Sequence, residues 1–394
     1  MATERAARRA TRSSRPGSRT ASGRPSGSSA VTGHEDLVRA LRGRGAVPPG
    51  WADAVAGVDR GRFVPDRTES LDRARDPEEW ARAVYDDTAI VTRTDAHGVP
   101  VSSSSMPSLM LEMLALLGVR EGDRVLEIGT GTGYNAALLT HRLGEARVVS
   151  VESASEVLDV ARGSLHGCGM RPLLVPGDGL LGHPERAPYD GIVATCTLGG
   201  VPAALLEQLA DGGRLVTPYG NSFHSYSLLT LTKRGRGGTG RFSGSPAFMW
   251  AEAHRPSRPL IREVYDGQPG EIAGTDIDPR TLEEPDARWF LSRFVPFARP
   301  VLYEAEDGSG EATYWLLSDD ARSWATVEYV PGREEFETEQ HGDRRLWDEV
   351  GDAHARWLAL GTPARDRFGL TFTGDGAEPE LWLDEPGNPV RLAE

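Results

Sequence analysis

The sequence has few cysteines and no long apolar segment. Its two cysteines, Cys168 and Cys196, match no metal-binding or redox spacing and are expected to be small buried groups. No apolar run approaches the ~20 residues that a membrane-spanning helix requires. The N-terminus has no apolar segment of the signal-peptide type. We therefore predict a cytoplasmic protein without a membrane partner.

Basic residues are outnumbered, with 44 Lys and Arg against 58 Asp and Glu and a formal net charge of -14. This balance argues against a nucleic-acid partner. Residues 1–33 are the exception, because they are rich in Arg, Ser, Gly and Ala and have little to bury. We predict that they form a disordered basic tail.

Segments with strand and helix patterns alternate in the middle of the chain. This alternation predicts a doubly wound, mainly parallel α/β sheet with helices on both of its faces. The expected strands cover 125–128, 147–151, 173–175, 189–194 and 214–218, and the expected helices cover 134–143, 155–166 and 202–209.

The character of the chain changes near residue 234. Residues 234–240 are rich in Gly and Arg and are expected to form a hairpin loop or linker. We predict one domain over 34–240 and a C-terminal mixed α+β extension over 241–394. In the extension, strands are expected at 247–250, 315–317, 324–329, 370–372 and 381–383, and an amphipathic helix at 344–360.

A glycine-rich turn follows the first strand of the alternating region. Gly129, Gly131 and Gly133 stand between that strand and the next helix, at the position where open α/β sheets bind nucleotides. The dinucleotide fingerprint G-x-G-x-x-G would place its third glycine at position 134, where this chain has Tyr134. The E-x-G-x-G-x-G pattern instead resembles motif I of class I S-adenosylmethionine-dependent methyltransferases, which have a Rossmann-like fold. Packing alone also produces such turns.

Acidic residues end three successive strands. Glu152 ends the second strand, where a carboxylate can accept hydrogen bonds from ribose hydroxyls. Asp178, after the third strand, is expected to reach the adenine amino group, and Glu127 to lie near the cationic methionine moiety. The predicted S-adenosylmethionine site therefore comprises Glu127, Gly129, Thr130, Gly131, Gly133, Tyr134, Glu152, Asp178 and Gly179.

Seven short segments together resemble the protein-L-isoaspartate O-methyltransferase family over roughly residues 50–234. In that family an Ile-Ser pair lies between the cofactor and the substrate carboxyl group, and Val101 and Ser102 match it. The resemblance implies that Ser102 is catalytic and that Val64, Ser103, Ser104 and Ser105 bind the substrate. The matching segments are 59–65, 83–88, 101–106, 124–134, 177–179, 189–195 and 212–218.

Two features depart from the repair enzymes of this family. The chain has Ser103–Ser105 where those enzymes commonly continue with Ala or Gln, Pro, and His or Tyr. It also continues for some 150 residues beyond the point where they usually end. Both features resemble actinobacterial homologues that accompany ribosomally made peptides such as lanthipeptides. This resemblance implies methylation of a normal Asp in a modified precursor peptide, through a succinimide to aspartimide or isoaspartate, with the extension recognising the peptide.

The chemistry needs no general base, because an Asp carboxylate with a pKa of about 3.9 is already ionised at neutral pH. The absence of a convincing Ser-His-Asp or metal-ligand pattern therefore fits catalysis by positioning. Two alternatives remain open. One is repair of L-isoaspartyl residues, and the other is a non-catalytic scaffold that binds cofactor and peptide, against which the three acids argue.

Overall fold

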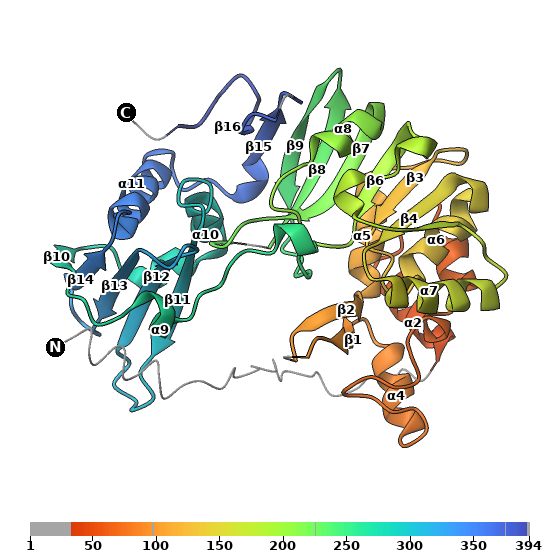
Figure 1. Cartoon of the computed structure of the whole chain (residues 1–394), viewed down its shortest axis with the longest axis horizontal. Helices are drawn as coiled ribbons and strands as arrows, with labels where there is room; N and C mark the ends of the chain where they lie inside the picture. The colour runs from red at the N-terminus through yellow and green to blue at the C-terminus, as the bar shows by residue number, and fades with distance from the viewer. Residues whose placement is uncertain (1–32, 97, 225, 375, 392–394) are drawn as a thin grey trace.

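The computed structural model describes residues 33–96, 98–224, 226–374 and 376–391. The basic tail predicted for residues 1–33 lies outside this part, apart from Gly33. Within the described residues, no helix is long and apolar enough to span a membrane. The chain folds around two sheets, one of nine strands and one of five, with a separate two-stranded hairpin near the N-terminus (Figure 1).

The nine-stranded sheet contains the five parallel strands that the alternating pattern predicts. Their order reverses at β3, which pairs in parallel with β4 on one side and with β6 on the other. Such a switch point opens a crevice at the carboxyl ends of the strands. The parallel strands are β3 (Val125–Ile128), β4 (Val148–Glu152), β5 (Leu173–Pro176), β6 (Tyr189–Ala194) and β7 (Leu209–Tyr219).

Helices cover both faces of this sheet, so the predicted doubly wound α/β fold is confirmed. Successive side chains of a strand point to opposite faces. Val125 therefore joins the core under α5 and α6, whereas Leu126 joins the core that contains α8 residues. The helices of this part are α2 (His34–Gly43), α3 (Ala52–Gly57), α4 (Pro77–Val84), α5 (Pro107–Leu117), α6 (Tyr134–Leu143), α7 (Ser155–Gly167) and α8 (Ala203–Gln208).

The extension supplies a second sheet and also completes the first. Its own antiparallel sheet, in the order β10-β14-β13-β12-β11, packs against α10 and α11. The last two strands then return to the nine-stranded sheet beside β9 (Figure 1). The elements are α9 (Ile261–Val264), β10 (Glu271–Thr275), α10 (Pro285–Leu291), β11 (Ala298–Glu304), β12 (Ala312–Ser318), β13 (Trp324–Tyr329), β14 (Phe336–His341), α11 (Leu346–Ala359), β15 (Phe368–Phe372) and β16 (Glu380–Leu383).

Of two expectations about the region after β7, one is confirmed and one is wrong. The hairpin that was expected at 234–240, with a linker as the alternative, is present as the turn between β8 (Ser227–Arg234) and β9 (Gly237–Ser243) together with the first half of β9. Glycines occur in β9 because β15 approaches closely: a Cβ at Gly237 would lie 1.9 Å from the carbonyl oxygen of Phe372. The predicted strand at 247–250 is absent, and Trp250 alone forms a bridge, to Thr197.

The close approach of β15 to β9 predicts that Gly237→Ala separates the two strands. We expect it to lower the free energy of unfolding by about 1–3 kcal/mol, because the backbone has no room for the methyl group. Gly163→Ala, in α7, is the matched control, since a Cβ there meets nothing within 4 Å. Urea unfolding of both variants measures the difference. Equal stability would show that the β9–β15 contact contributes nothing.

Candidate active site

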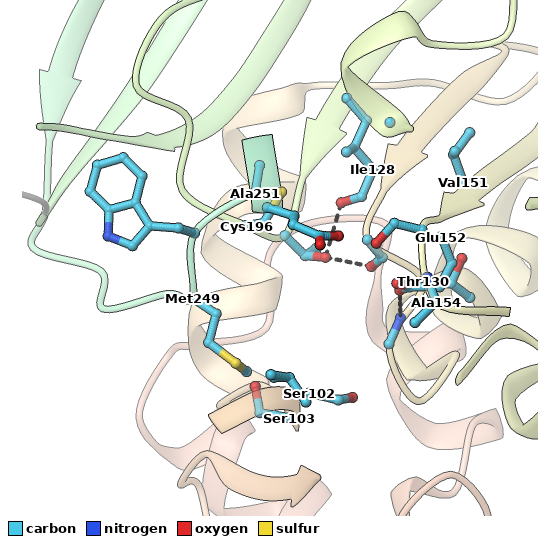
Figure 2. A pocket seen from close by; sticks show the side chains of 18 of the residues that line it. Ser102, Ser103, Ile128, Thr130, Val151, Glu152, Ala154, Cys196, Met249 and Ala251 are labelled. Atoms are coloured by element: carbon cyan, nitrogen blue, oxygen red, sulfur yellow. Dashed lines mark hydrogen bonds between the residues drawn. The ribbon is translucent and has the colours of Figure 1, made fainter. Parts of the chain in front are cut away.

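One pocket of about 720 Å³ lies at the carboxyl ends of the parallel strands (Figure 2). The turn after β3 and the first residues after β4, β5 and β6 form one side. The hairpin of β1 (Ile90–Thr94) and β2 (Pro100–Ser104) forms the second side. Residues 249–255, from the start of the extension, form the third. The switch point at β3 therefore carries a large cavity.

The three glycines after β3 are required by the backbone. Gly129, Gly131 and Gly133 have φ angles of 90°, 53° and 87°, which residues with a Cβ rarely adopt. They also allow close contacts, because a Cβ at Gly131 would lie 3.4 Å from the carbonyl oxygen of Ser103. Gly129, Thr130, Gly131 and Tyr134 line the pocket. Gly133 does not, because it packs against α7.

Two of the predicted acids face the pocket. Glu152 accepts hydrogen bonds from the backbone N–H groups of Gly131, at 3.0 Å, and Ala154, at 3.2 Å. Its carboxylate therefore fixes the glycine turn and still has lone pairs directed toward a ligand. Asp178 accepts from the Leu180 N–H at 2.9 Å and lines the same pocket.

Gly179 follows Asp178 in the pocket wall and also needs to lack a side chain. A Cβ at this position would lie 2.3 Å from the Cγ2 atom of Ile128. The loop after β5 therefore packs directly on the end of β3, which draws Asp178 toward the glycine turn.

Glu127 lies beneath the pocket instead of in its wall, contrary to the position expected for it. It is fully buried, and its carboxyl group accepts from Asn135 Nδ2 at 2.8 Å and from the Ser150 hydroxyl. Ser150 also shares a 2.7 Å hydrogen bond with Thr130 Oγ1. Burial raises the pKa of Glu127 to about 7. Glu127 therefore connects the glycine turn to the start of α6 through groups that do face the pocket.

The serine run is divided between the pocket and the buried Arg60. Ser102, Ser103 and Ser105 line the pocket. Ser102 is 8% exposed, and its hydroxyl oxygen accepts from Thr92 Oγ1 at 3.1 Å. Ser104 is buried and accepts from Arg60 instead. Val64 is also outside the site, since it lines a different, shallow depression beside Trp80.

A buried arginine that sequence reasoning left without a role fixes this side of the pocket. The side chain of Arg60 is inaccessible to solvent, and its guanidinium donates to five backbone carbonyls at 2.8–3.1 Å. Burial lowers its pKa to about 10. The only sequence signal was its place in the 59–65 segment. The five carbonyls belong to Val84, Asp86, Thr88, Ser104 and Ser105.

The third wall was also missed. Residues 249–255 follow β9 and place Met249, Trp250 and Arg255 at the pocket. Met249 extends toward Ser102 and Ser103 from the opposite side (Figure 2). No sequence pattern predicts this contact, because it joins segments almost 150 residues apart. Among the described residues, no group of His, Cys, Asp and Glu side chains is arranged to hold a metal ion.

The first part of the chain, up to residue 240, matches a known protein family. A family model described as protein-L-isoaspartate(D-aspartate) O-methyltransferase matches residues 32–240. A protein-L-isoaspartate O-methyltransferase of Methanospirillum hungatei is 38% identical over 195 residues, which are 49% of this chain and 81% of that protein. One from Burkholderia cenocepacia is 38% identical over 219 residues, covering 53% of this chain and 63% of that protein.

A solved structure bears on the extension. It is titled protein-L-isoaspartate O-methyltransferase, has a TM-score of 0.54 and 23% identity, and covers 89% of this chain and 100% of that one. At this identity the similarity concerns the fold. A protein of this title therefore shares the fold over most of the chain, part of the extension included.

The buried Glu127 predicts a pH-dependent stability. Its pKa is near 7 in the folded protein and 4.5 as an isolated group, so unfolding between these values releases a proton. Stability is then favoured at low pH and is lost as the pH rises. Relative to Glu127→Gln, the free energy of unfolding of the wild type should fall by about 3 kcal/mol from pH 4.5 to pH 8.

Chemical unfolding at a series of pH values tests this prediction. Glu121→Gln is the control, because Glu121 is exposed on a loop before β3. Its stability should follow that of the wild type at every pH. Parallel curves for wild type and Glu127→Gln would mean that Glu127 titrates normally in the folded protein.

Proposed function

Because the chain belongs to the protein-L-isoaspartate O-methyltransferase family, we propose that it transfers a methyl group from S-adenosylmethionine to the free α-carboxylate of an isoaspartyl residue in a peptide or protein. The observation that carries this proposal is the arrangement of one pocket. Glu152, Asp178 and the glycine turn lie on one side of it, and the hydroxyl of Ser102 on another. A volume of about 720 Å³ accommodates a nucleoside cofactor and the end of a side chain.

The donor set fits S-adenosylmethionine. Carboxylates such as Glu152 accept hydrogen bonds from ribose hydroxyls, and Asp178 is placed at the end of the next strand, where adenine contacts are made. Acidic residues in the lining also favour a cation. S-adenosylmethionine supplies an electrophilic methyl group on a positively charged sulfur. Thr130 and Gly131 are proposed to complete its site, whereas Glu127 and Gly133 are proposed to support the turn from outside.

The residues of the chain act by positioning. The acceptor carboxylate is ionised at neutral pH and needs no base. Thr92 donates to the Ser102 oxygen, so the Ser102 proton remains available for a further acceptor. We propose that it is donated to the carboxylate oxygen that does not react, which directs the other oxygen toward the methyl group. The methyl ester is then attacked by the following backbone nitrogen, and methanol and a succinimide are formed.

A second candidate keeps the same chemistry but acts on a normal Asp of a ribosomally made precursor peptide. Ser103 and Ser105 favour it, because they line the pocket where repair enzymes of the family commonly carry other residues. In either case the proposed partner is a peptide or protein and the proposed location is the cytoplasm. The free state of Cys168 and Cys196 is compatible with that location.

The two candidates predict different acceptors. With S-adenosylmethionine, a short isoaspartyl peptide should gain a methyl group and then lose methanol, both visible by mass spectrometry. The same peptide with Asp at that position should react much more slowly. Preferential methylation of Asp in a cyclised precursor peptide would replace repair by tailoring. Cofactor binding without methylation of any acceptor would favour the scaffold.

Ser102→Ala should lower kcat for the better acceptor about 10- to 100-fold, because a misplaced carboxylate reacts slowly. Cofactor affinity should stay the same. Ser104→Ala is a revealing comparison, since Ser104 is buried against Arg60 and is outside the pocket. An unchanged kcat in Ser102→Ala would remove Ser102 from the proposed mechanism.

Glu152→Ala should weaken binding of S-adenosylmethionine by about 1–3 kcal/mol, because ribose hydrogen bonds and the support of the Gly131 N–H are lost together. Calorimetry measures the affinity directly. Glu156→Ala is the control, since Glu156 is exposed on α7 and forms an ion pair with Arg93. Equal affinities in the two variants would contradict the cofactor assignment.

A further inference from the structure

The pocket wall formed by residues 249–255 has no role in the proposed cofactor site or in the proposed action of Ser102. We propose that this wall selects the acceptor and that Arg255 binds the carboxylate that is to be methylated, an inference that rests on the proposed function. Arg255 would then be a specificity-determining residue contributed by the extension.

The wall is held in place although most of it has no regular secondary structure. Thr197, which follows β6, is inaccessible to solvent and forms three hydrogen bonds to it. Its N–H donates to Met249 O at 2.7 Å, its hydroxyl donates to Phe248 O at 3.1 Å, and its carbonyl accepts from Ala251 N at 3.0 Å. The segment is therefore fixed to the end of the parallel sheet beside the reacting groups.

A second connection holds the far end of the wall. The N–H of Gly199 donates to His254 Nδ1 at 3.2 Å, and the His254 N–H donates to Ala251 O at 2.9 Å. A Cβ at Gly199 would lie 3.7 Å from the Trp250 ring, so the indole packs over this glycine. Arg255 directly follows His254, so its backbone is positioned by the residues that precede it.

The charges of the pocket single out Arg255. Four acidic residues line it, and Arg255 is the one basic residue among the described lining residues. A carboxylate that enters such a site is repelled by the acids unless a cation compensates. Within the described part of the chain, the Arg255 side chain forms no ion pair that would occupy it. The four acids are Asp95, Glu152, Asp178 and Glu252.

The same pairing would distinguish the acceptor from the product. Methyl transfer forms a bond between the carboxylate oxygen and the methyl carbon and breaks the sulfur–carbon bond, whose electrons remain on sulfur. The carboxylate becomes a neutral ester and the sulfonium a neutral thioether. An ion pair with Arg255 therefore exists before the reaction and is lost after it, which favours acceptor binding and product release.

Replacement of Arg255 by Gln should separate binding from chemistry. Because Arg255 is exposed, the ion pair is partly screened, and we expect KM for the isoaspartyl peptide to rise about fivefold. The value of kcat and the affinity for S-adenosylmethionine should change little. The KM of Arg255→Lys should stay close to that of the wild type. Arg258→Gln is the control, because it removes the same charge three positions later and outside the pocket lining. It should leave KM unchanged.

A neutral peptide provides the direct test of charge. The isoaspartyl peptide and its α-carboxamide analogue are compared as ligands, the analogue as an inhibitor of methylation. The wild type should prefer the carboxylate about fivefold, and Arg255→Gln should bind both alike.

If wild type and Arg255→Gln discriminate equally while methylation proceeds, the proposal for Arg255 is wrong and the function stands. If kcat and cofactor affinity fall while KM rises, Arg255 is structural and the proposal is again wrong. If the wild type methylates no carboxylate peptide, the proposed function itself fails.

Discussion

The buried guanidinium of Arg60 is the interaction on which the acceptor side of the pocket depends. Its donors reach the end of α4, the loop that follows and the end of β2, so three segments are fixed by one group. The planar guanidinium reaches the carbonyls with Nη1 and Nη2 and the Ser104 hydroxyl with Nε, whereas a lysine has three donors on a flexible stem. Burying the charge is costly, and the complete set of hydrogen bonds offsets that cost. Ser102 and Ser105 keep their places because the backbone beside them cannot shift.

Glu127 fixes the cofactor side of the pocket in the same way. It too is buried and hydrogen-bonded, and through Ser150 and Asn135 it connects the glycine turn to the first turn of α6. The two sides meet where Gly131 approaches the carbonyl of Ser103. A pocket for two substrates must hold both at fixed separation, and here two buried ionisable residues outside the cavity hold its opposite walls.

The sequence predicts what local patterns encode. The parallel strands, the glycine turn and the positions of Glu152 and Asp178 follow from periodicity and from where acids end strands. Glu127 was misplaced because a carboxylate at a strand end gives no local sign of whether it faces a ligand or Ser150 beneath it. Ser104 was grouped with its neighbours because a run of four serines does not show that Arg60, 44 residues earlier, contacts one of them. The glycines of β9 left both a hairpin and a linker open, and only contact with β15, more than 120 residues later, explains why these residues are glycines.

The extension contributes to the active-site region in two ways, by completing the sheet and by lining the pocket. β15 and β16 complete the edge of the catalytic sheet through β9, so part of the extension belongs to the fold of the enzyme itself. Residues 249–255 instead line the pocket and are attached to the loop after β6 through Thr197. A structural contribution of the first kind is compatible with any acceptor, and a known isoaspartyl methyltransferase fold includes it. Discrimination between acceptors therefore has to come from side chains that reach the cavity. In this chain the extension contributes Met249, Trp250, Glu252 and Arg255 to the pocket, and Met249 extends toward Ser102 and Ser103.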